Sequence, residues 1–448
     1  MNDTKPLHTH SISRNRPDGA LRNGSRPNTN LPDGALRNTN RPDASLPAGA
    51  LRAPVPRVLL GNTGLSVSRA GFGVLPMGPA QLALPLEEGA RLISHAMDCG
   101  INFFDTAQYY RTYPYLRLAL QRRDQSPSSR PIGHADRAGG SEPTEWSALT
   151  GPEHASEWSA LAGPEPVICS KSLAADYDGM MAAIEEARRE LDRDVIDIFL
   201  MHEVRTGQLP QRARAWEALQ DARARGWIRA CGMSTHHVNV AAAAAQMREL
   251  DVVFPLLNYA GLGIRTSKDP REAGGPEAAW SASRLGGEIG RAGAAAVVNR
   301  EGRPAERFAT AEEMMEAIRL CRRAGKGVFT MKAFGGGSLT ATYRQALDYV
   351  FGQPEVDAVM IGFGRISEID DLISYLSGSM APAYQPDVSH KRIHINQEDC
   401  EGCGACRAAC PAGAIFWNGS GLAEVDPDRC LTCGYCTPVC PVRAVIMY

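Results

Sequence analysis

The chain has 448 residues, which is more than one ordinary domain of roughly 100 to 200 residues and enough to bury a large core. Its 48 basic and 50 acidic residues give a formal net charge of −2, so no overall basic field drives binding to nucleic acid or to an anionic membrane. No run approaches roughly 18 apolar residues, and residues 1–54 hold no apolar signal segment. We therefore expect neither a transmembrane helix nor a cleaved secretion signal.

Three stretches have a composition typical of loops or disorder. Residues 1–54 lack Phe, Trp and Tyr and repeat the motif PDGALRN. Residues 123–165 repeat a motif around Trp146 and Trp158, and residues 266–308 are rich in Gly, Ala, Pro and Arg. We expect a low-complexity tail and two loop insertions, in which the repeated tryptophans are either a linear binding motif or tolerated surface expansion.

Between these stretches, short apolar runs alternate with helix-period segments. The candidate strands are Ala70–Leu75, Ile101–Asp105, Pro166–Lys171, Ile196–His202, Arg229–Ser234, Val252–Asn258, Gly327–Lys332 and Asp357–Gly362. The candidate helices are Leu86–Met97, Asp176–Leu191, Gln211–Arg225, Val238–Leu250, Ala311–Ala324, Thr340–Phe351 and Ser367–Leu376. Apolar strands without alternation suit a parallel sheet buried on both faces. The pattern predicts an α/β fold, a (β/α)8 TIM barrel whose base is plugged by a hairpin at Arg57–Ser68.

In such a barrel the functional residues lie at the carboxyl ends of the strands. Those ends carry Asp105, with Tyr110 just beyond it, then Lys171 and His202. A tyrosine is a weak acid, but a neighbouring ammonium favours the phenolate, so Lys171, held by Asp105, would help Tyr110 to protonate a carbonyl oxygen. His202 would hydrogen-bond the same oxygen. Each residue alone has an ordinary structural explanation, as a helix cap, a packed ring, a solvated charge or a core histidine, and only the combination indicates a site.

The segments around these residues resemble the aldo-keto reductase family. The resemblance rests on INFFDTAQYY from Ile101, VICSKS from Val167, DIFLMHE from Asp197 and IRACGMS from Ile228. It implies a TIM barrel that reduces aldehydes or ketones, or oxidises alcohols, with NAD(P)H. The family's spacing between the catalytic Asp and Tyr selects Tyr110 rather than Tyr109.

The same resemblance implies positions for the cofactor. The residues that correspond to the nicotinamide and pyrophosphate contacts, and to the region of the 2′-phosphate contacts, are Ser234, Asn258, Met331, Lys332, Gly335, Gly362 and Arg365. Arg365 is the one basic residue in the segment GFGRISEIDD, where family members selective for NADPH carry several cations. NADPH, NADH and a non-nucleotide electron source all stay open.

Eight of the twelve cysteines fall within the last 49 residues, in two runs of the pattern C-x2-C-x2-C-x3-C-P. The pattern is typical of [4Fe-4S] ligation and resembles a bacterial two-cluster ferredoxin. The resemblance implies one cluster on Cys400, Cys403, Cys406 and Cys440, and a second on Cys430, Cys433, Cys436 and Cys410. Structural zinc is the alternative, but zinc ligands usually form pairs separated by a longer loop. The remaining Cys99, Cys169, Cys231 and Cys321 are expected to be small buried apolar residues.

These predictions divide the chain into a tail at 1–54, a barrel at 55–387 with insertions 123–165 and 266–308, and a ferredoxin-like α+β domain at 388–448. We expect a cytoplasmic oxidoreductase that acts on a small carbonyl or alcohol, carries two [4Fe-4S] clusters, and exchanges electrons with its cofactor or with a redox partner protein. Two alternatives remain open: a cofactor-binding regulatory subunit, and an electron-transfer subunit in which the barrel serves to dock the ferredoxin domain.

Overall fold

The structure is a computed structural model, and it describes residues 55–79, 81–125, 165–267, 306–388, 390–397, 399–430, 436–440, 442 and 444–447. The expected tail, the greater part of both expected insertions, and the predicted ligand Cys433 lie outside these residues.

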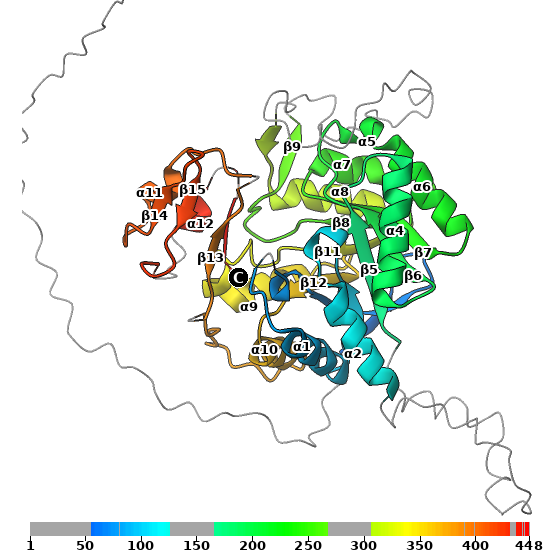
Figure 1. The fold of residues 1–448 in the computed structure, drawn as a ribbon, viewed down its shortest axis with the longest axis horizontal. Coiled ribbons are helices and arrows are strands. Elements are labelled where there is room, and N and C mark those ends of the chain that lie inside the picture. The colour runs from blue at the N-terminus through cyan, green and yellow to red at the C-terminus, as the bar shows by residue number, and fades with distance from the viewer. Residues whose placement is uncertain are drawn as a thin grey trace, which may run out of the picture. The chain divides into compact units, whose positions relative to one another are not determined.

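Eight parallel strands close into one barrel (Figure 1). In spatial order they are β11 (Gly327–Thr330), β12 (Ala358–Gly362), β3 (Ala70–Gly73), β4 (Phe103–Asp105), β5 (Val167–Ser172), β6 (Ile196–Met201), β7 (Ile228–Thr235) and β8 (Val252–Pro255). Pairing of β8 with β11 completes the ring. Each strand lies where an apolar run predicts it, so the predicted α/β barrel is confirmed.

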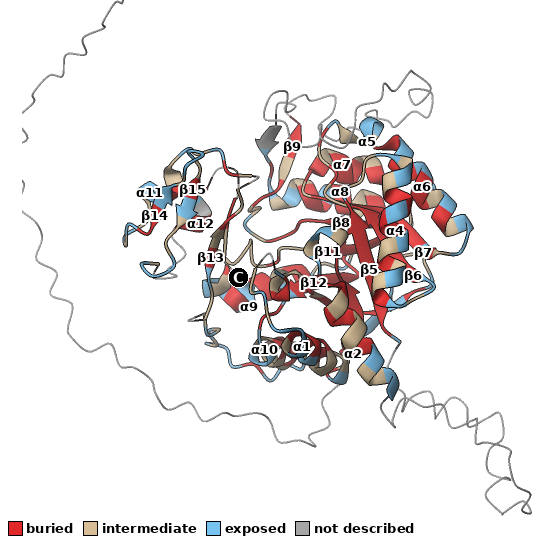
Figure 2. Ribbon diagram, in the orientation of Figure 1, coloured by how far each residue is buried: buried red, intermediate tan, exposed pale blue. Residues whose placement is uncertain are grey.

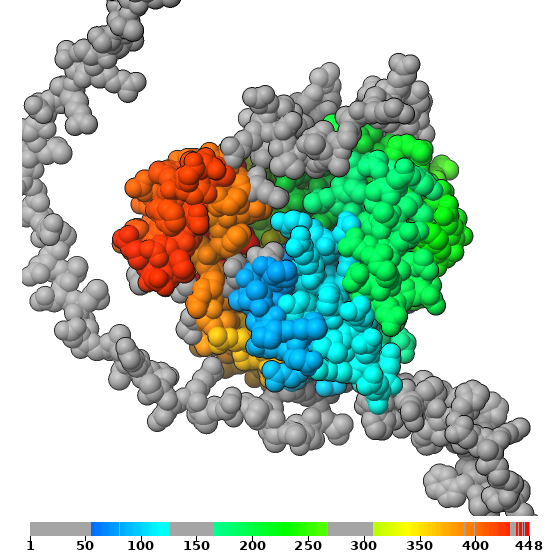
Figure 3. All heavy atoms as spheres, viewed as in Figure 1, coloured from blue at the N-terminus to red at the C-terminus, as the bar shows by residue number. Residues whose placement is uncertain are grey.

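Helices cover the outside of the barrel. They are α1 (Leu86–Asp98), α2 (Tyr113–Gln125), α4 (Tyr177–Leu191), α6 (Ala213–Ala224), α7 (Val238–Ala244), α8 (Ala311–Arg323), α9 (Tyr343–Phe351) and α10 (Ile366–Leu376). Figure 3 shows the cyan α2 beside the green α4 on the face in view, and α4 in turn packs against α6. All but α2 were predicted as helix-period segments. Among the described helices, none has the length and apolar character needed to cross a membrane.

The barrel has two apolar cores, and Figure 2 shows that the strands between them are almost wholly buried. The larger core lies between the strands and the helices, and the smaller one fills the inside of the barrel. The hairpin of β1 (Arg57–Leu59) and β2 (Ser66–Ser68) contributes Leu60, Leu65 and Val67 to the inner core. The hairpin therefore plugs the barrel as predicted.

Ordered structure extends into the margins of both expected insertions. Helix α2 continues to Gln125, beyond the expected boundary at residue 123. On the other side, β9 (Arg265–Ser267) pairs antiparallel with β10 (Glu306–Phe308), although residues 266–308 were expected to be a patternless loop. Strands of three residues are too short to show a period in the sequence.

Three aspartates near the amino ends of the strands repeat one arrangement in the described part of the chain. Each carboxylate accepts a hydrogen bond from a backbone amide of a neighbouring strand and pairs with an arginine. Asp197 accepts from the Ile168 amide and pairs with Arg229. Asp251 accepts from the Cys231 amide and pairs with Arg223. Asp357 accepts from the Val328 amide and pairs with Arg322. These contacts tie neighbouring strands together at the end of the barrel opposite the predicted site.

The C-terminal residues form two short antiparallel pairs and two short helices. Strand β13 (Ile393–Ile395) pairs with β16 (Val445–Met447), and β14 (Ile415–Trp417) pairs with β15 (Ala423–Val425). Helices α11 (Ala405–Ala408) and α12 (Cys436–Val439) each include the third cysteine of one run, Cys406 or Cys436. This α+β arrangement agrees with the predicted fold class.

Replacing Asp357 tests the arrangement at the base. One carboxylate oxygen accepts from the amides of Val328, at 2.9 Å, and Gly61, at 3.1 Å, and the carboxylate also pairs with Arg322. Asp357→Ala would leave both amides without this acceptor, so we expect the free energy of unfolding to fall by about 3 kcal/mol. Asp357→Asn keeps an acceptor oxygen and should lose less than half of that in anaerobic urea unfolding. Equal losses for the two variants would contradict this explanation.

Candidate active site and cluster domain

The four predicted catalytic residues meet at the carboxyl end of the barrel. Asp105 ends β4, Lys171 lies near the end of β5, and His202 follows β6 directly. Tyr110 lies in a short 3-10 helix, Gln108–Tyr110, after β4. The topology places these strands side by side, so residues nearly 100 positions apart in the sequence come into contact.

A buried ion pair forms the floor of the site. The ammonium of Lys171 donates to both carboxylate oxygens of Asp105, at 2.7 and 2.8 Å, and to the carbonyl oxygen of Thr106 at 2.7 Å. Lys171 is 1% exposed and Asp105 is 5% exposed. Burial disfavours the charge on Lys171, but the Asp105 carboxylate outweighs it, so the pKa of Lys171 lies above its usual value. The lysine is therefore a permanent cation at neutral pH.

Tyr110 and His202 lie above this pair and are half-buried. The Tyr110 hydroxyl lies 3.3 Å from Nε2 of His202, and the Lys171 ammonium lies 4.7 Å from the centre of the Tyr110 ring. The neighbouring Tyr109 is 54% exposed. The structure thus brings Tyr110, the tyrosine selected by the spacing, next to His202.

Burial is the largest cause of the pKa shifts of Tyr110 and His202. Burial raises the pKa of Tyr110 to about 12, against the opposing effect of Lys171. Lys171 thus acts on the Tyr110 pKa in the expected direction, but the effect of burial is larger, so the net pKa is raised. Burial, with the positive charges of Lys171 and Arg212, holds the pKa of His202 well below its usual value, so its ring is neutral. Its Nδ1 is buried and has no hydrogen-bond partner among the described residues.

Arg212 was not predicted to be part of the site. It holds the backbone at the ends of β5 and β6. Its side chain is 2% exposed and donates to the carbonyl oxygens of His202, Ser172 and Ala174, at 2.7, 3.0 and 3.2 Å. Burial lowers the pKa of this guanidinium to about 10, although Glu203 acts in the opposite direction. It holds the backbone that carries Lys171 and His202 without touching the open site.

The residues expected near a nicotinamide form hydrogen bonds with other residues of the chain. The Ser234 hydroxyl accepts a hydrogen bond from the Glu203 amide at 2.8 Å. The side-chain amide of Asn258 donates to the Leu262 carbonyl at 3.0 Å and accepts from the Leu262 amide at 2.9 Å. Met331 is half-buried and bridges β8 and β11 through its backbone. Ser234 and Asn258 are buried, and their side chains form hydrogen bonds within the protein.

The loop after β11 combines a cation with glycines. Lys332 has a left-handed backbone with φ of 64°, and no described group forms a hydrogen bond or ion pair with its ammonium. Burial lowers the pKa of Lys332, while Glu203 and Asp399 oppose that effect. Gly335 also has a positive φ, 58°. A half-buried lysine without a partner beside a glycine-rich turn is a suitable site for a phosphate group.

The start of α10 is occupied by a carboxylate of the protein, that of Glu368. The Glu368 carboxylate accepts from the backbone amides of Gly364 and Arg365, at 2.6 and 3.2 Å, and pairs with His390 and Lys391. Burial would raise the pKa of Glu368, but the bonds from His390 and Lys391 lower it to about 2, so the group is ionised. Arg365 and the predicted Gly362, at the end of β12, are both exposed.

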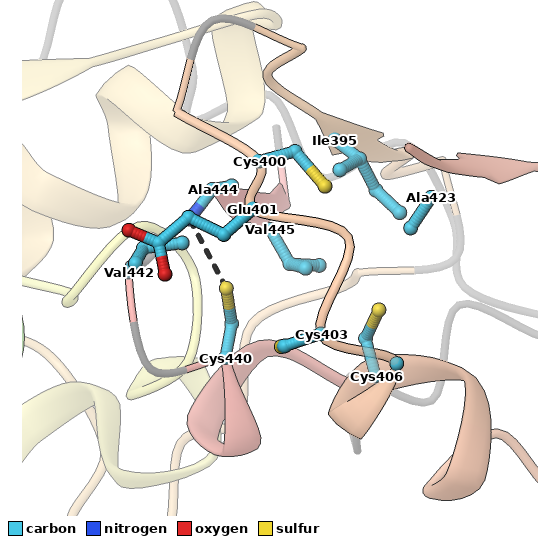
Figure 4. A pocket seen from close by; sticks show the side chains of 11 residues that line it. Ile395, Cys400, Glu401, Cys403, Cys406, Ala423, Cys440, Val442, Ala444 and Val445 are labelled. Atoms are coloured by element: carbon cyan, nitrogen blue, oxygen red, sulfur yellow. Dashed lines mark hydrogen bonds between the residues drawn. The ribbon is translucent and has the colours of Figure 1, made fainter. Parts of the chain in front are cut away.

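One pocket of the C-terminal domain is lined by cysteines from both runs (Figure 4). They are Cys400, Cys403 and Cys406 from the first run and Cys440 from the second. Figure 4 shows the sulfur atoms of Cys400, Cys406 and Cys440 pointing into the space between them. The Ala444 amide donates to the Cys440 sulfur at 3.2 Å. The donor set, four sulfurs around one cavity, fits the predicted first cluster.

The described cysteines of the other group are arranged in the same way. Cys410 accepts a hydrogen bond from the Ala414 amide at 3.3 Å, as Cys440 does from Ala444. Burial raises the pKa of Cys436 to about 12, and Cys430, Cys406 and Cys410 act in the same direction. Cys410 and Cys430 also pack against the apolar cluster of this domain that includes Cys436.

An ion-pair chain joins the two domains. Arg205 pairs with Glu203 at 2.7 Å and with Asp399 at 3.4 Å. Glu203 follows His202 in the sequence, and Asp399 precedes Cys400. His202, a candidate catalytic residue, and Cys400, a candidate cluster ligand, are therefore each next in the sequence to a carboxylate that pairs with Arg205.

Strand β16 contacts the glycine-rich loop after β11 directly. The Met447 amide donates to the Gly336 carbonyl at 2.9 Å, and Arg265 donates to the Val442 carbonyl at 2.8 Å. A Cβ atom added to Gly337 would lie 2.7 Å from the Cβ of Met447, which no residue larger than glycine tolerates. The cluster domain and the loop that carries Lys332 thus form a shared contact.

Comparisons with known proteins identify both parts of the chain. Residues 70–272 match the model of the aldo/keto reductase family, and residues 393–447 match that of the 4Fe-4S dicluster domain. The barrel segment is thus similar to the aldo/keto reductase family, and the C-terminal segment is similar to 4Fe-4S dicluster domains. Both matches confirm the resemblances read from the sequence.

The individual relatives are distant or short matches. A segment of 51 residues is 45% identical to L-galactose dehydrogenase from Arabidopsis thaliana, and it spans 11% of this chain and 16% of that dehydrogenase. A putative aldo-keto reductase from Pseudomonas aeruginosa is 20% identical with a TM-score of 0.48, covering 74% of this chain and 98% of its own. The holo form of an aldo-keto reductase from Bacillus halodurans is 14% identical with a TM-score of 0.45, at the same coverage.

Arg212 offers a test of how the barrel holds the backbone at its candidate site. Arg212→Met removes three charge-assisted hydrogen bonds to backbone carbonyls, so we expect the free energy of unfolding to fall by about 3 kcal/mol. Arg214, two residues later, is exposed and pairs with Glu217, so Arg214→Met should change stability by less than about 0.5 kcal/mol. Anaerobic denaturant unfolding of the three proteins measures both values. Similar losses for the two variants would show that Arg212 is no more than a surface charge.

Proposed function

We propose that this chain interconverts a small carbonyl compound and its alcohol at Asp105, Tyr110, Lys171 and His202, and exchanges electrons with two [4Fe-4S] clusters in its C-terminal domain. The observation that carries the proposal is the Tyr110 hydroxyl, 3.3 Å from a neutral histidine and above a buried ammonium. Such a phenol is placed to give a proton to a carbonyl oxygen or to take one from an alcohol.

In the reducing direction, Tyr110 is the acid. Its pKa of about 12 keeps the proton on the phenol at neutral pH, so the residue enters the reaction in the correct state. As the proton leaves, the growing negative charge is stabilised by Lys171, which Asp105 holds as a cation. His202 is neutral and orients the phenol and the substrate oxygen by a hydrogen bond from Nε2.

The unpaired cation and the glycine turn after β11 fit a dinucleotide. NAD(H), when bound, would supply or accept the hydride. Lys332 and the backbone around Gly335 would hold its pyrophosphate, and Ser234 and Met331 would border the nicotinamide. At the start of α10, the ionised Glu368 would repel a 2′-phosphate and accept a hydrogen bond from a ribose hydroxyl. We infer a preference for NADH over NADPH.

The predicted cluster ligands are supported by the crossed arrangement of the cysteines. Cys400, Cys403, Cys406 and Cys440 would hold the first cluster. The second would be held by Cys430, Cys433, Cys436 and Cys410, of which Cys433 lies outside the described residues. Two clusters together store two electrons, the number that one carbonyl reduction consumes. Clusters of this kind suit a reducing, oxygen-poor cytoplasm.

Two contacts support electron exchange between the domains. The chain from Glu203 through Arg205 to Asp399 joins the surroundings of His202 to those of Cys400. The bond from Met447 to Gly336 places the cluster domain against the loop proposed to hold the dinucleotide. A redox partner protein would then fill or empty the clusters from the outside.

The role of Tyr110 is tested by a pair of adjacent tyrosines. Tyr110→Phe removes the proton donor and should lower kcat for a panel of aldehydes and ketones by roughly 10³-fold. Tyr109→Phe changes an exposed ring and should leave kcat within twofold. Steady-state assays with NADH under anaerobic conditions measure both. Unchanged turnover in Tyr110→Phe would favour the alternative of a regulatory or electron-transfer subunit.

Cluster coupling and the choice of nucleotide are tested together by an anaerobic titration. We expect NADH to bleach the cluster absorbance at a concentration about tenfold lower than NADPH, because Glu368 disfavours the 2′-phosphate. Glu368→Gln keeps an acceptor for the α10 amides but removes the charge, and it should reduce that preference to about threefold. If neither nucleotide bleaches the clusters, the barrel and the cluster domain work separately. A preference for NADPH would contradict the assignment of Glu368.

A further inference from the structure

A second group of chemically active side chains lies on the outside of the barrel, away from the tetrad and the cysteine runs. His95 and Cys99 come from the C-terminal end of α1, and Asp370 comes from α10. Nε2 of His95 lies 2.9 Å from an Asp370 carboxylate oxygen and 3.6 Å from the Cys99 sulfur. All three ligand atoms lie within 4.8 Å of one another. We propose that these residues form a zinc site that fastens the first helix of the barrel to the last.

His95 faces the other two proposed ligands with the same ring nitrogen. A single ring nitrogen faces both a carboxylate oxygen and a sulfur, and one N–H bond points at only one of them. A cation between the three atoms satisfies all three at once. For tetrahedral zinc, bond lengths of about 2.0 Å to nitrogen and about 2.3 Å to sulfur place those two ligand atoms about 3.5 Å apart. The observed separation of 3.6 Å agrees with this value, whereas Nε2 and the Asp370 oxygen, now 2.9 Å apart, would move apart by about 0.5 Å to admit the ion.

The chemical types of the three ligand atoms also suit zinc. One imidazole nitrogen, one thiolate and one carboxylate suit a borderline metal such as Zn²⁺, whereas Ca²⁺ and Mg²⁺ prefer oxygen ligands throughout. The Cys99 side chain is buried, while His95 and Asp370 are 26% and 28% exposed, so a water molecule has access to a fourth position. Cys99 differs here from Cys169, Cys231 and Cys321, which are completely buried.

The local charge also suits a cation. Asp370 pairs with His95, and the carboxylate of Asp98 lies close enough to interact with the same ring. Two carboxylates therefore lie near the imidazole ring, which favours a bound cation there.

The position gives the site a structural role. Helix α1 follows β3 and α10 follows β12, and pairing of β12 with β3 closes the barrel between its two ends in the sequence. A metal held by α1 and α10 would cross-link the first and the last βα units on the outside of that seam. Because the folded barrel alone brings the three ligands together, zinc binding would stabilise the folded state.

The experiment uses the full chain with reconstituted clusters, ZnCl₂ as the probe, and zinc per chain measured by mass spectrometry after desalting. We expect one zinc, with an X-ray absorption spectrum at the zinc edge that shows one sulfur and otherwise nitrogen or oxygen ligands. Saturation should raise the unfolding midpoint by about 3 °C or more. Cys99→Ser should weaken zinc binding at least tenfold.

Two further variants make the result decisive. Asp370→Asn keeps the size of the side chain and should also weaken binding, and it serves if Cys99→Ser fails to fold. Cys321→Ser, at a buried cysteine of α8, is the matched control and should bind zinc as the unmodified chain does. Zinc held by sulfur alone, or bound equally by all variants, would place the metal on the cluster cysteines and overturn the proposal. No retained zinc in the unmodified chain would also overturn it.

Discussion

The functional end of the barrel depends on the buried ion pair between Lys171 and Asp105. Neither charge reaches water to any extent, so each is stable there only because the other is present. Removing one partner of such a pair costs about 3–5 kcal/mol, because the remaining charge stays buried. The third bond of Lys171, to the Thr106 carbonyl, also fixes the start of the segment that leads to Tyr110. The position of the phenol above the ammonium follows from these contacts.

The two ends of the barrel strands differ in how completely their polar and charged groups are paired. At the base, Asp197, Asp251 and Asp357 each hold a backbone amide and an arginine, so polar groups and charges are matched. At the carboxyl end, Lys332 has a charge without a described partner and His202 has a buried nitrogen without one. A protein tolerates such unmatched groups where a ligand supplies the missing contacts. Stability and function are therefore assigned to different ends of the same strands.

The sequence predicts what depends on local pattern and fails where tertiary contacts decide. The eight strands, the hairpin and the cysteine runs have strong local signals, and the spacing to Tyr110 selected the tyrosine beside His202. Helix α2 was missed because Leu118 lies outside its buried face and its last turn is polar, so its helical period is weak. Arg212 is one of many arginines until the fold buries it. The raised pKa of Tyr110 was missed for a related reason: desolvation depends on the surrounding packing, whereas the neighbouring lysine can be read from the motif.

The contact between the domains gives the glycines after β11 separate tasks. Gly335 has the positive φ that turns the backbone beside Lys332, which suits the approach of a phosphate. Gly337, in contrast, is the position where any side chain would collide with Met447, so its lack of a side chain serves the docking of β16. Gly336, between them, accepts the hydrogen bond from the Met447 amide. One short loop therefore carries both the cation of Lys332 and the contact with β16, and the glycines at 335 and 337 answer to different neighbours.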